Sequence, residues 1–310
     1  MTAQKITLPT VRRVLTSDWN VHNPEKCVKL IESLKYIYPT IIIDELIDMI
    51  IQPKINNAVK LWNPKEDLVP IHFWIFPWLP LLKSKLSIYY SDIRRKLGLS
   101  LLLWQPTDTS AYTIILPWKN VFDKTSMDNF LIRTIIPKLI IGMKSIIINP
   151  GNQEINLFQN IIAWNNVIPT VHMISILCGE FFNKWLRVLI NWLMINPDFT
   201  EVSEWYSGWK SLFPINLLEE LSIMEYFNTA LNLMNIVLMS EDEVECRELL
   251  NKESLSLPDT SYHLFLEKKL NEIKMKERLD ELNKNERYSK NTTAGAPYTL
   301  GTYAKSFLNH

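Results

Sequence analysis

The stretch from Leu61 to Pro80, LWNPKEDLVPIHFWIFPWLP, places three tryptophans and four prolines within twenty residues. Proline fixes φ and removes a backbone N–H, so this spacing interrupts helices and predicts a rigid connector. Each tryptophan ring can bury roughly 150–250 Å² of surface. We therefore expect the connector to pack against the body of the protein with its tryptophans in the core.

Helical patterns surround this connector, whereas the evidence for strands is poor. Asn23-Pro24 is a typical helix start, and apolar residues then recur at helical spacing until Pro39. The chain has only seven glycines in 310 residues and no Asn-Gly or Asp-Gly pair, which leaves few sites for hairpin turns. The sequence therefore predicts an all-α fold.

A second connector, residues 104–118, echoes the first. Trp62-Asn63-Pro64 matches Trp104-Gln105-Pro106 at a spacing of 42 residues (62 to 104), and Pro77-Trp78 matches Pro117-Trp118 at 40 (78 to 118). A weaker echo pairs Gln52-Pro53-Lys54-Ile55 with Ile136-Pro137-Lys138-Leu139, 84 residues apart (53 to 137). Repeats of about 40–47 residues are typical of solenoids built from helix pairs. We expect an irregular solenoid-like array of helix pairs with Trp/Pro-rich connectors.

The composition divides the chain into four segments. Residues 1–61 form N-terminal helices continuous with the array, and residues 62–240 form the main helical domain. Residues 241–288 are rich in charge, and a thin apolar stripe from His263 to Tyr288 predicts a projecting helix or coiled-coil arm. Residues 289–310 have little periodicity, and we expect a disordered tail.

Charge and cysteine usage narrow the class of protein. Thirty-three basic and thirty-three acidic residues give a net charge of zero, so there is no bulk attraction for nucleic acid. Three dispersed cysteines are typical of a reducing intracellular compartment. The most apolar stretch, 171–195, carries Glu180, Lys184 and Arg187, which are costly in lipid. It reads as a buried helix, and we expect no membrane contact.

Motifs for catalysis or cofactors are missing from the sequence. It contains no G-x-x-x-x-G-K-[ST] and no H-E-x-x-H, and its five histidines do not share ligand spacings. We therefore expect no enzyme activity, no cofactor and no metal. Asp67 and His72 are the one candidate acid/base pair. The alternative is that both side chains bind backbone groups freed by neighbouring prolines.

Five basic residues are candidates for an interaction surface. Arg94, Arg95 and Lys96 form a cluster, and Lys119 and Lys210 each follow a tryptophan. Interleaved aromatic and basic residues can clamp single-stranded nucleic acid. The alternatives are solvated charges and cation–π packing.

Several blocks in order carry a family resemblance: LWNP, VPIHFWIFPWLP, IRRKL, LLLWQPTDTSA, LPWKNVF, FFNKWL, EVSEWYSGWKSLFP and FNTALNLMN. Together they resemble the GC-rich sequence DNA-binding factor-like domain of the tuftelin-interacting protein 11 and nineteen-complex-related protein family, over roughly Trp62 to Met239. The motif residues, which we expect to be mainly structural, are Trp62, Pro64, Asp67, Pro70, His72, Trp74, Pro77, Trp78, Pro80, Trp104, Pro106, Asp108, Trp118, Trp185, Trp205 and Trp209.

The resemblance implies a nuclear, non-enzymatic scaffold of the late spliceosome. Family members help to release the excised intron lariat by bringing a DEAH-box helicase to the spent complex, and contacts with RNA are expected to be indirect. They carry a glycine-rich G-patch that binds and activates the helicase, but no glycine precedes Gly98 here. We therefore expect this chain to dock on spliceosomal proteins without stimulating the helicase. The alternative function is a DNA- or RNA-binding regulatory module of the same family.

Overall fold

The computed structural model describes residues 2–17, 19–195, 197–240 and 242–293, and every regular element within these ranges is helical. The predicted all-α class is therefore confirmed. The first half of the described chain contains the helices α1 (Thr2–Ser17), α2 (Glu25–Leu34), α3 (Thr40–Leu46), α4 (Gln52–Leu61), α5 (Ile71–Ile75), α6 (Leu79–Leu82), α7 (Ser87–Ser100), α8 (Ser110–Ile115), α9 (Lys124–Thr134) and α10 (Ile136–Ser145).

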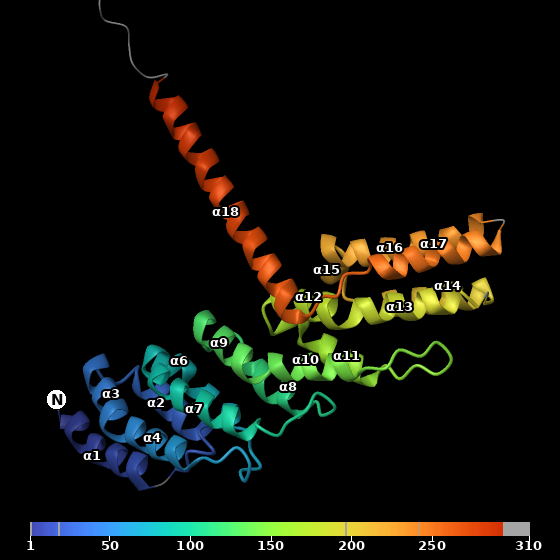
Figure 1. Cartoon of the computed structure of the whole chain (residues 1–310). Helices are drawn as coiled ribbons and strands as arrows, with labels where there is room; N and C mark the ends of the chain where they lie inside the picture. Colours follow the sequence, from blue (N-terminus) through green and yellow to red (C-terminus); the bar gives the residue numbers. More distant parts are fainter. Residues whose placement is uncertain (1, 18, 196, 241, 294–310) are drawn as a thin grey trace, which may run out of the picture.

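The second half ends in a helix that leaves the body of the protein. Its helices are α11 (Asn156–Ile162), α12 (Thr170–Ile176), α13 (Phe182–Leu193), α14 (Phe199–Ser211), α15 (Ile215–Leu218), α16 (Leu221–Met239), α17 (Glu243–Ser256) and α18 (Tyr262–Thr293). Figure 1 shows the body as an elongated array that runs from α1 at one end to α13–α17 at the other. The α17 helix packs on α13 and α16, while most of α18 stands away from the body.

The boundaries follow local residue chemistry. Asp123 and Asp198 accept hydrogen bonds from backbone N–H groups at the starts of α9 and α14, as N-cap residues do. The predicted helix from His263 is found as α18, and it continues to Thr293, past the predicted start of the tail. The rest of that predicted tail lies outside the described residues.

The connector of residues 61–80 is more helical than the sequence predicts. Only the segment from Trp62 to Pro70 is irregular, and α5, a 3₁₀ turn and α6 follow it. Pro70 occupies the N-cap of α5, and Pro77 and Pro80 lie in first turns, where a helix needs no N–H donor. These prolines therefore start helices instead of separating them.

A lysine recurs at a regular spacing along the array, and each copy joins its own helix to a helix earlier in the chain. Lys54, Lys96, Lys138 and Lys184 lie at spacings of 42, 42 and 46 residues (54 to 96, 96 to 138 and 138 to 184). Each ammonium donates to backbone carbonyls at or just beyond the carboxyl end of an earlier helix. These helices are α1, α4, α7 and α10, respectively.

Such carbonyls lack partners within their own helix, and the helix dipole places negative charge there, so a cation is favoured. The residues that follow the four lysines, Ile55, Leu97, Leu139 and Trp185, are all buried. The repeated unit thus combines a polar cap with an apolar core contact. In the sequence, this repeated unit is visible only as Pro-Lys and Trp-x-Pro motifs that recur at similar spacings.

Two π-helical turns interrupt the array, at Ile47–Ile51 before α4 and at Leu177–Phe181 between α12 and α13. The second turn supports the start of α18. Within the described residues, no helix is both long and apolar enough to cross a membrane.

Candidate functional site

Most tryptophans of the family motif lie in the core, and Trp205 is partly buried against it. Trp74, Trp78, Trp118 and Trp185 are completely buried, and Trp62 and Trp104 are nearly so. Pro106 packs so closely on α10 that a Cβ at Gly142 would lie 3.1 Å from its ring. These residues position the surfaces of the array, and their burial leaves little of them for a partner.

The Trp185 region is an aromatic cluster between α13 and α14. The rings of Trp185 and Trp205 stack with centroids 5.3 Å apart, and the Trp205 ring meets Trp209 edge-on at 6.4 Å. Lys210 lies 5.9 Å from the Tyr206 ring centroid. Lys210 therefore lies at cation–π distance from an aromatic ring, as in the alternative to nucleic-acid binding.

The candidate acid/base residues have separate structural partners. Asp67 Oδ2 accepts a hydrogen bond from the backbone N–H of Asn63 at 2.8 Å, which closes the turn that follows α4. The His72 ring packs on Phe73 and Phe76, and burial lowers the pKa of its imidazole. Within the described residues no hydrogen bond or ion pair joins the carboxylate to the imidazole. The structure thus gives the pair no common site.

Asp108, the loose counterpart of Asp67 in the second connector, also holds a turn. Its carboxylate accepts hydrogen bonds from the hydroxyl and the backbone N–H of Ser110, and these bonds lower the pKa of Asp108. Both aspartates therefore organise backbone at the starts of the connectors.

The predicted basic cluster divides between two faces of α7. Lys96 is half-buried and donates to the carbonyl oxygens of Val59, Lys60 and Trp62 at 2.9, 2.7 and 2.5 Å. Arg94 and Arg95 instead line an open groove of about 380 Å³ between α7 and α9.

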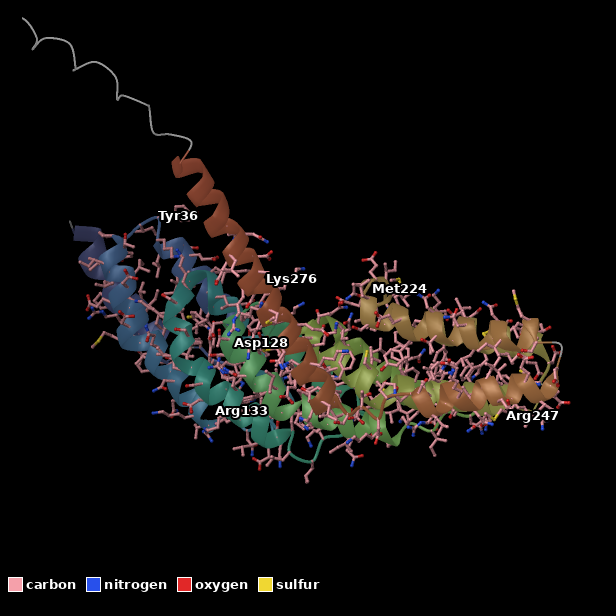
Figure 2. The ribbon with its side chains drawn as sticks, turned by 45° about the horizontal axis from the view of Figure 1, so that its top comes forward. Tyr36, Asp128, Arg133, Met224, Arg247 and Lys276 are labelled. Atoms are coloured by element: carbon pink, nitrogen blue, oxygen red, sulfur yellow. The ribbon has the colours of Figure 1, made fainter. Side chains whose placement is uncertain are left out.

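The α9 side of this groove adds a third arginine, Arg133, which lies on the surface of α9 near the label in Figure 2. The remaining lining residues are Gly98, Ser126, Asn129, Phe130 and Thr134. Sequence reasoning missed Arg133 because it lies on a different helix from Arg94 and has no basic neighbour. The three arginines make this groove the candidate interaction site.

A second polar cluster anchors α18 on the π-helical turn, and we call it the arm root: Gly179, Glu180, Asn183, His172 and Tyr262. The Glu180 carboxylate accepts a hydrogen bond from the Tyr262 backbone N–H at 2.8 Å and lies 3.7 Å from the Lys144 ammonium. Asn183 donates to the Pro258 carbonyl oxygen at 2.9 Å. The His172 ring nitrogen lies 2.7 Å from the Tyr262 hydroxyl.

Burial lowers the pKa of His172 and raises that of Tyr262 to about 12, so both groups are neutral near pH 7. The sequence signals the arm root only through a glycine and a glutamate inside an apolar run. Tyr262, whose backbone N–H bonds to Glu180, lies 82 residues further along the chain.

Metal-binding side chains do not gather in the part of the chain that the structure describes. No group of three or more His, Cys, Asp or Glu residues there could hold a metal ion. Cys27 and Cys178 are buried, and burial raises the pKa of both thiols.

Comparison with known proteins adds the family. The family described as GC-rich sequence DNA-binding factor-like protein matches residues 2–189. The chain is 40% identical over 231 residues to tuftelin-interacting protein 11 from Homo sapiens and from Pan troglodytes, and 39% identical to that from Sus scrofa. These matches cover 74% of this chain and 28% of each relative, so the chain spans just over a quarter of their length. A family match over more than half of its residues shows that the chain belongs to the GC-rich sequence DNA-binding factor-like protein family.

Proposed function

We propose that this chain is a non-enzymatic scaffold of the late spliceosome, which acts in the nucleus during spliceosome disassembly and release of the intron lariat. The observation that carries the proposal is how the polar side chains of the array are used. Lys96 and Lys184 cap helices, and Asp67 and Asp108 close turns. Residues that could do chemistry thus serve the shape of an extended helical surface.

Exposed apolar residues support a docking role. Leu68 is 98% exposed and Leu103 is 88% exposed, and they lie in the irregular segments that follow α4 and α7. Each has an exposed apolar neighbour, Val69 at 47% and Leu102 at 62%, and large apolar side chains exposed in groups are typical of interaction surfaces. The proposed partners are spliceosomal proteins. A DEAH-box helicase would join through the G-patch of full-length relatives, as the family resemblance implies.

Excess of this chain should compete with a full-length relative and slow disassembly. When residues 1–310 alone are overexpressed in nuclei, we expect excised intron lariats to accumulate, because these residues would occupy the spent complex without a G-patch to activate the helicase. Quantitative PCR across lariat branch junctions measures the effect. Substituting serine at both Leu68 and Leu103 should reduce the accumulation without changing the melting temperature, because both side chains are exposed. Unchanged lariat levels with a folded, nuclear protein would contradict the proposal.

The alternative, a nucleic-acid-binding module, is favoured by one observation, the three arginines of the groove between α7 and α9. It would make binding of DNA or RNA fall steeply with salt concentration, since each phosphate contact releases counterions. The net charge of the chain is zero and does not support nucleic-acid binding, so this alternative rests on the groove alone.

A further inference from the structure

We propose that the groove between α7 and α9 binds a phosphorylated serine or threonine side chain from an extended segment of a protein partner. This inference goes beyond the scaffold role and does not depend on which assembly the scaffold joins. It rests on the charges of the groove, on its polar walls and on where the other cations of the array are engaged.

Three arginine residues line one small space. A guanidinium presents a planar fork of donors that matches two phosphate oxygens at once. Arg95 lies 3.6 Å from Asp92, but both side chains are more than half exposed, so this ion pair is weak. It would give way to a doubly charged phosphate.

Arg94 is held in place before any ligand arrives. Its guanidinium carbon lies 4.9 Å from the centroid of the Phe122 ring, a distance at which a cation–π interaction holds the group against the ring. Its Nη1 atom is buried and has no hydrogen-bond partner among the described residues. The Asp123 carboxylate interacts electrostatically with Arg94 but leaves this donor atom without a hydrogen bond. Burying such a donor is costly, and an anion in the adjacent groove would offset part of this cost.

The walls of the groove suit a peptide. Asn129 contributes an amide, while the Thr134 hydroxyl donates to the Phe130 carbonyl oxygen and the Ser126 hydroxyl bonds to Asp123, and Gly98 and Phe130 contribute a small apolar surface. The Asn129 side chain is exposed and could bond to a peptide backbone. A space of about 380 Å³ lies within the range of small ligand sites.

The charge distribution favours a phosphorylated side chain over a nucleic acid. A phosphomonoester concentrates about −1.5 to −2 charges at one point, whereas a nucleic-acid strand needs a track of cations along several phosphates. Nearby Lys96 and Lys138 point to carbonyl oxygens of their own chain, and Lys210 packs over Tyr206. These three lysines are therefore not available to extend the arginine cluster into a track of cations, and the cluster suits a single concentrated anion.

Fluorescence anisotropy with the full chain tests the proposal. The probe is a short labelled peptide of glycine and alanine with one central phosphoserine, compared with its unphosphorylated form and with an oligouridine of similar length. We expect saturable binding of the phosphopeptide, at least about tenfold tighter than that of the unphosphorylated peptide, as expected for one or two added charge-assisted hydrogen bonds. Inorganic phosphate should compete.

Arg133→Gln and Arg95→Gln should each weaken the phosphopeptide about fivefold to tenfold, through loss of one charge-assisted contact. Lys119→Gln is the matched control, because Lys119 is exposed and does not line the groove. All three variants should keep the melting temperature. Equal affinity for both peptides, or no effect of Arg133→Gln, would overturn the proposal. Tighter binding of oligouridine with a steep salt dependence would overturn it in favour of RNA.

Discussion

Replacing Gly179 by alanine is expected to lower the free energy of unfolding by about 3 kcal/mol and to loosen the start of α18, because the site has no room for a side chain. A Cβ there would lie 2.4 Å from the Tyr262 backbone nitrogen and 2.6 Å from the Ser261 carbonyl carbon. Both are backbone atoms, so the start of α18 must move. The movement would break the Glu180 and Asn183 hydrogen bonds that hold it.

Gly208 in α14 is the matched control. A Cβ at this position meets no atom within 4 Å. Gly208→Ala is therefore expected to stabilise the protein by about 0.5–1 kcal/mol, the ordinary gain of alanine over glycine inside a helix. The two substitutions have the same chemistry and opposite expected signs.

Urea unfolding monitored by circular dichroism measures both free energies, and limited proteolysis between α17 and α18 reports the release of α18. A Gly179→Ala protein as stable as the unsubstituted chain, with unchanged cleavage in this segment, would show that the arm root does not hold the helix as the structure describes.

Substituting methionine for Lys184 is expected to destabilise the protein by about 2–4 kcal/mol, since it removes the ammonium and leaves several carbonyls without a charged donor. Lys184 Nζ donates to the carbonyl oxygens of Met143, Lys144 and Ile146 at 2.8, 3.0 and 3.0 Å. Methionine keeps an apolar stem of similar length, so the measurement reports the cap more than the packing.

Burial lowers the pKa of Lys184, so part of the gain from its three hydrogen bonds is already offset by desolvation. The net effect is therefore smaller than the sum of three charged bonds. Lys138 donates to one carbonyl, that of Leu102, and Lys138→Met should cost only about 1 kcal/mol.

Exposed Lys119 supplies the control in this series, with an expected change within about 0.5 kcal/mol. Thermal and urea unfolding of the three variants test the order Lys184, Lys138, Lys119. Equal effects of Lys184→Met and Lys119→Met would mean that the recurring lysines do not join the helices of the array.

The helical class and the buried tryptophans follow from local patterns in the sequence. Proline and aspartate residues at helix starts predict the helices. Large apolar side chains such as Trp74 and Trp78 are expected to be buried in the core. The structure of the connector is harder to predict, because proline can either end or begin a helix. Tertiary packing decides between these two outcomes. Pro77 and Pro80 begin them here.

The caps and the arm root depend on distant partners. Lys184 acts on carbonyls 38 to 41 residues earlier, and Glu180 acts on a backbone N–H 82 residues later. The sequence alone does not reveal these contacts, and it shows Glu180 and Lys184 only as charged residues in an apolar run. Arg133 was missed for the same reason, since the groove exists only when α9 packs beside α7.

Sequencing the RNA that co-purifies with the tagged chain from nuclear extract tests the scaffold proposal most directly. The account predicts enrichment of excised intron lariats and of the small nuclear RNAs of the late spliceosome over a tag-only control. This enrichment should persist in Asp67→Asn, because that carboxylate closes a turn instead of performing a reaction. Recovery of a folded chain without those RNAs would contradict the account.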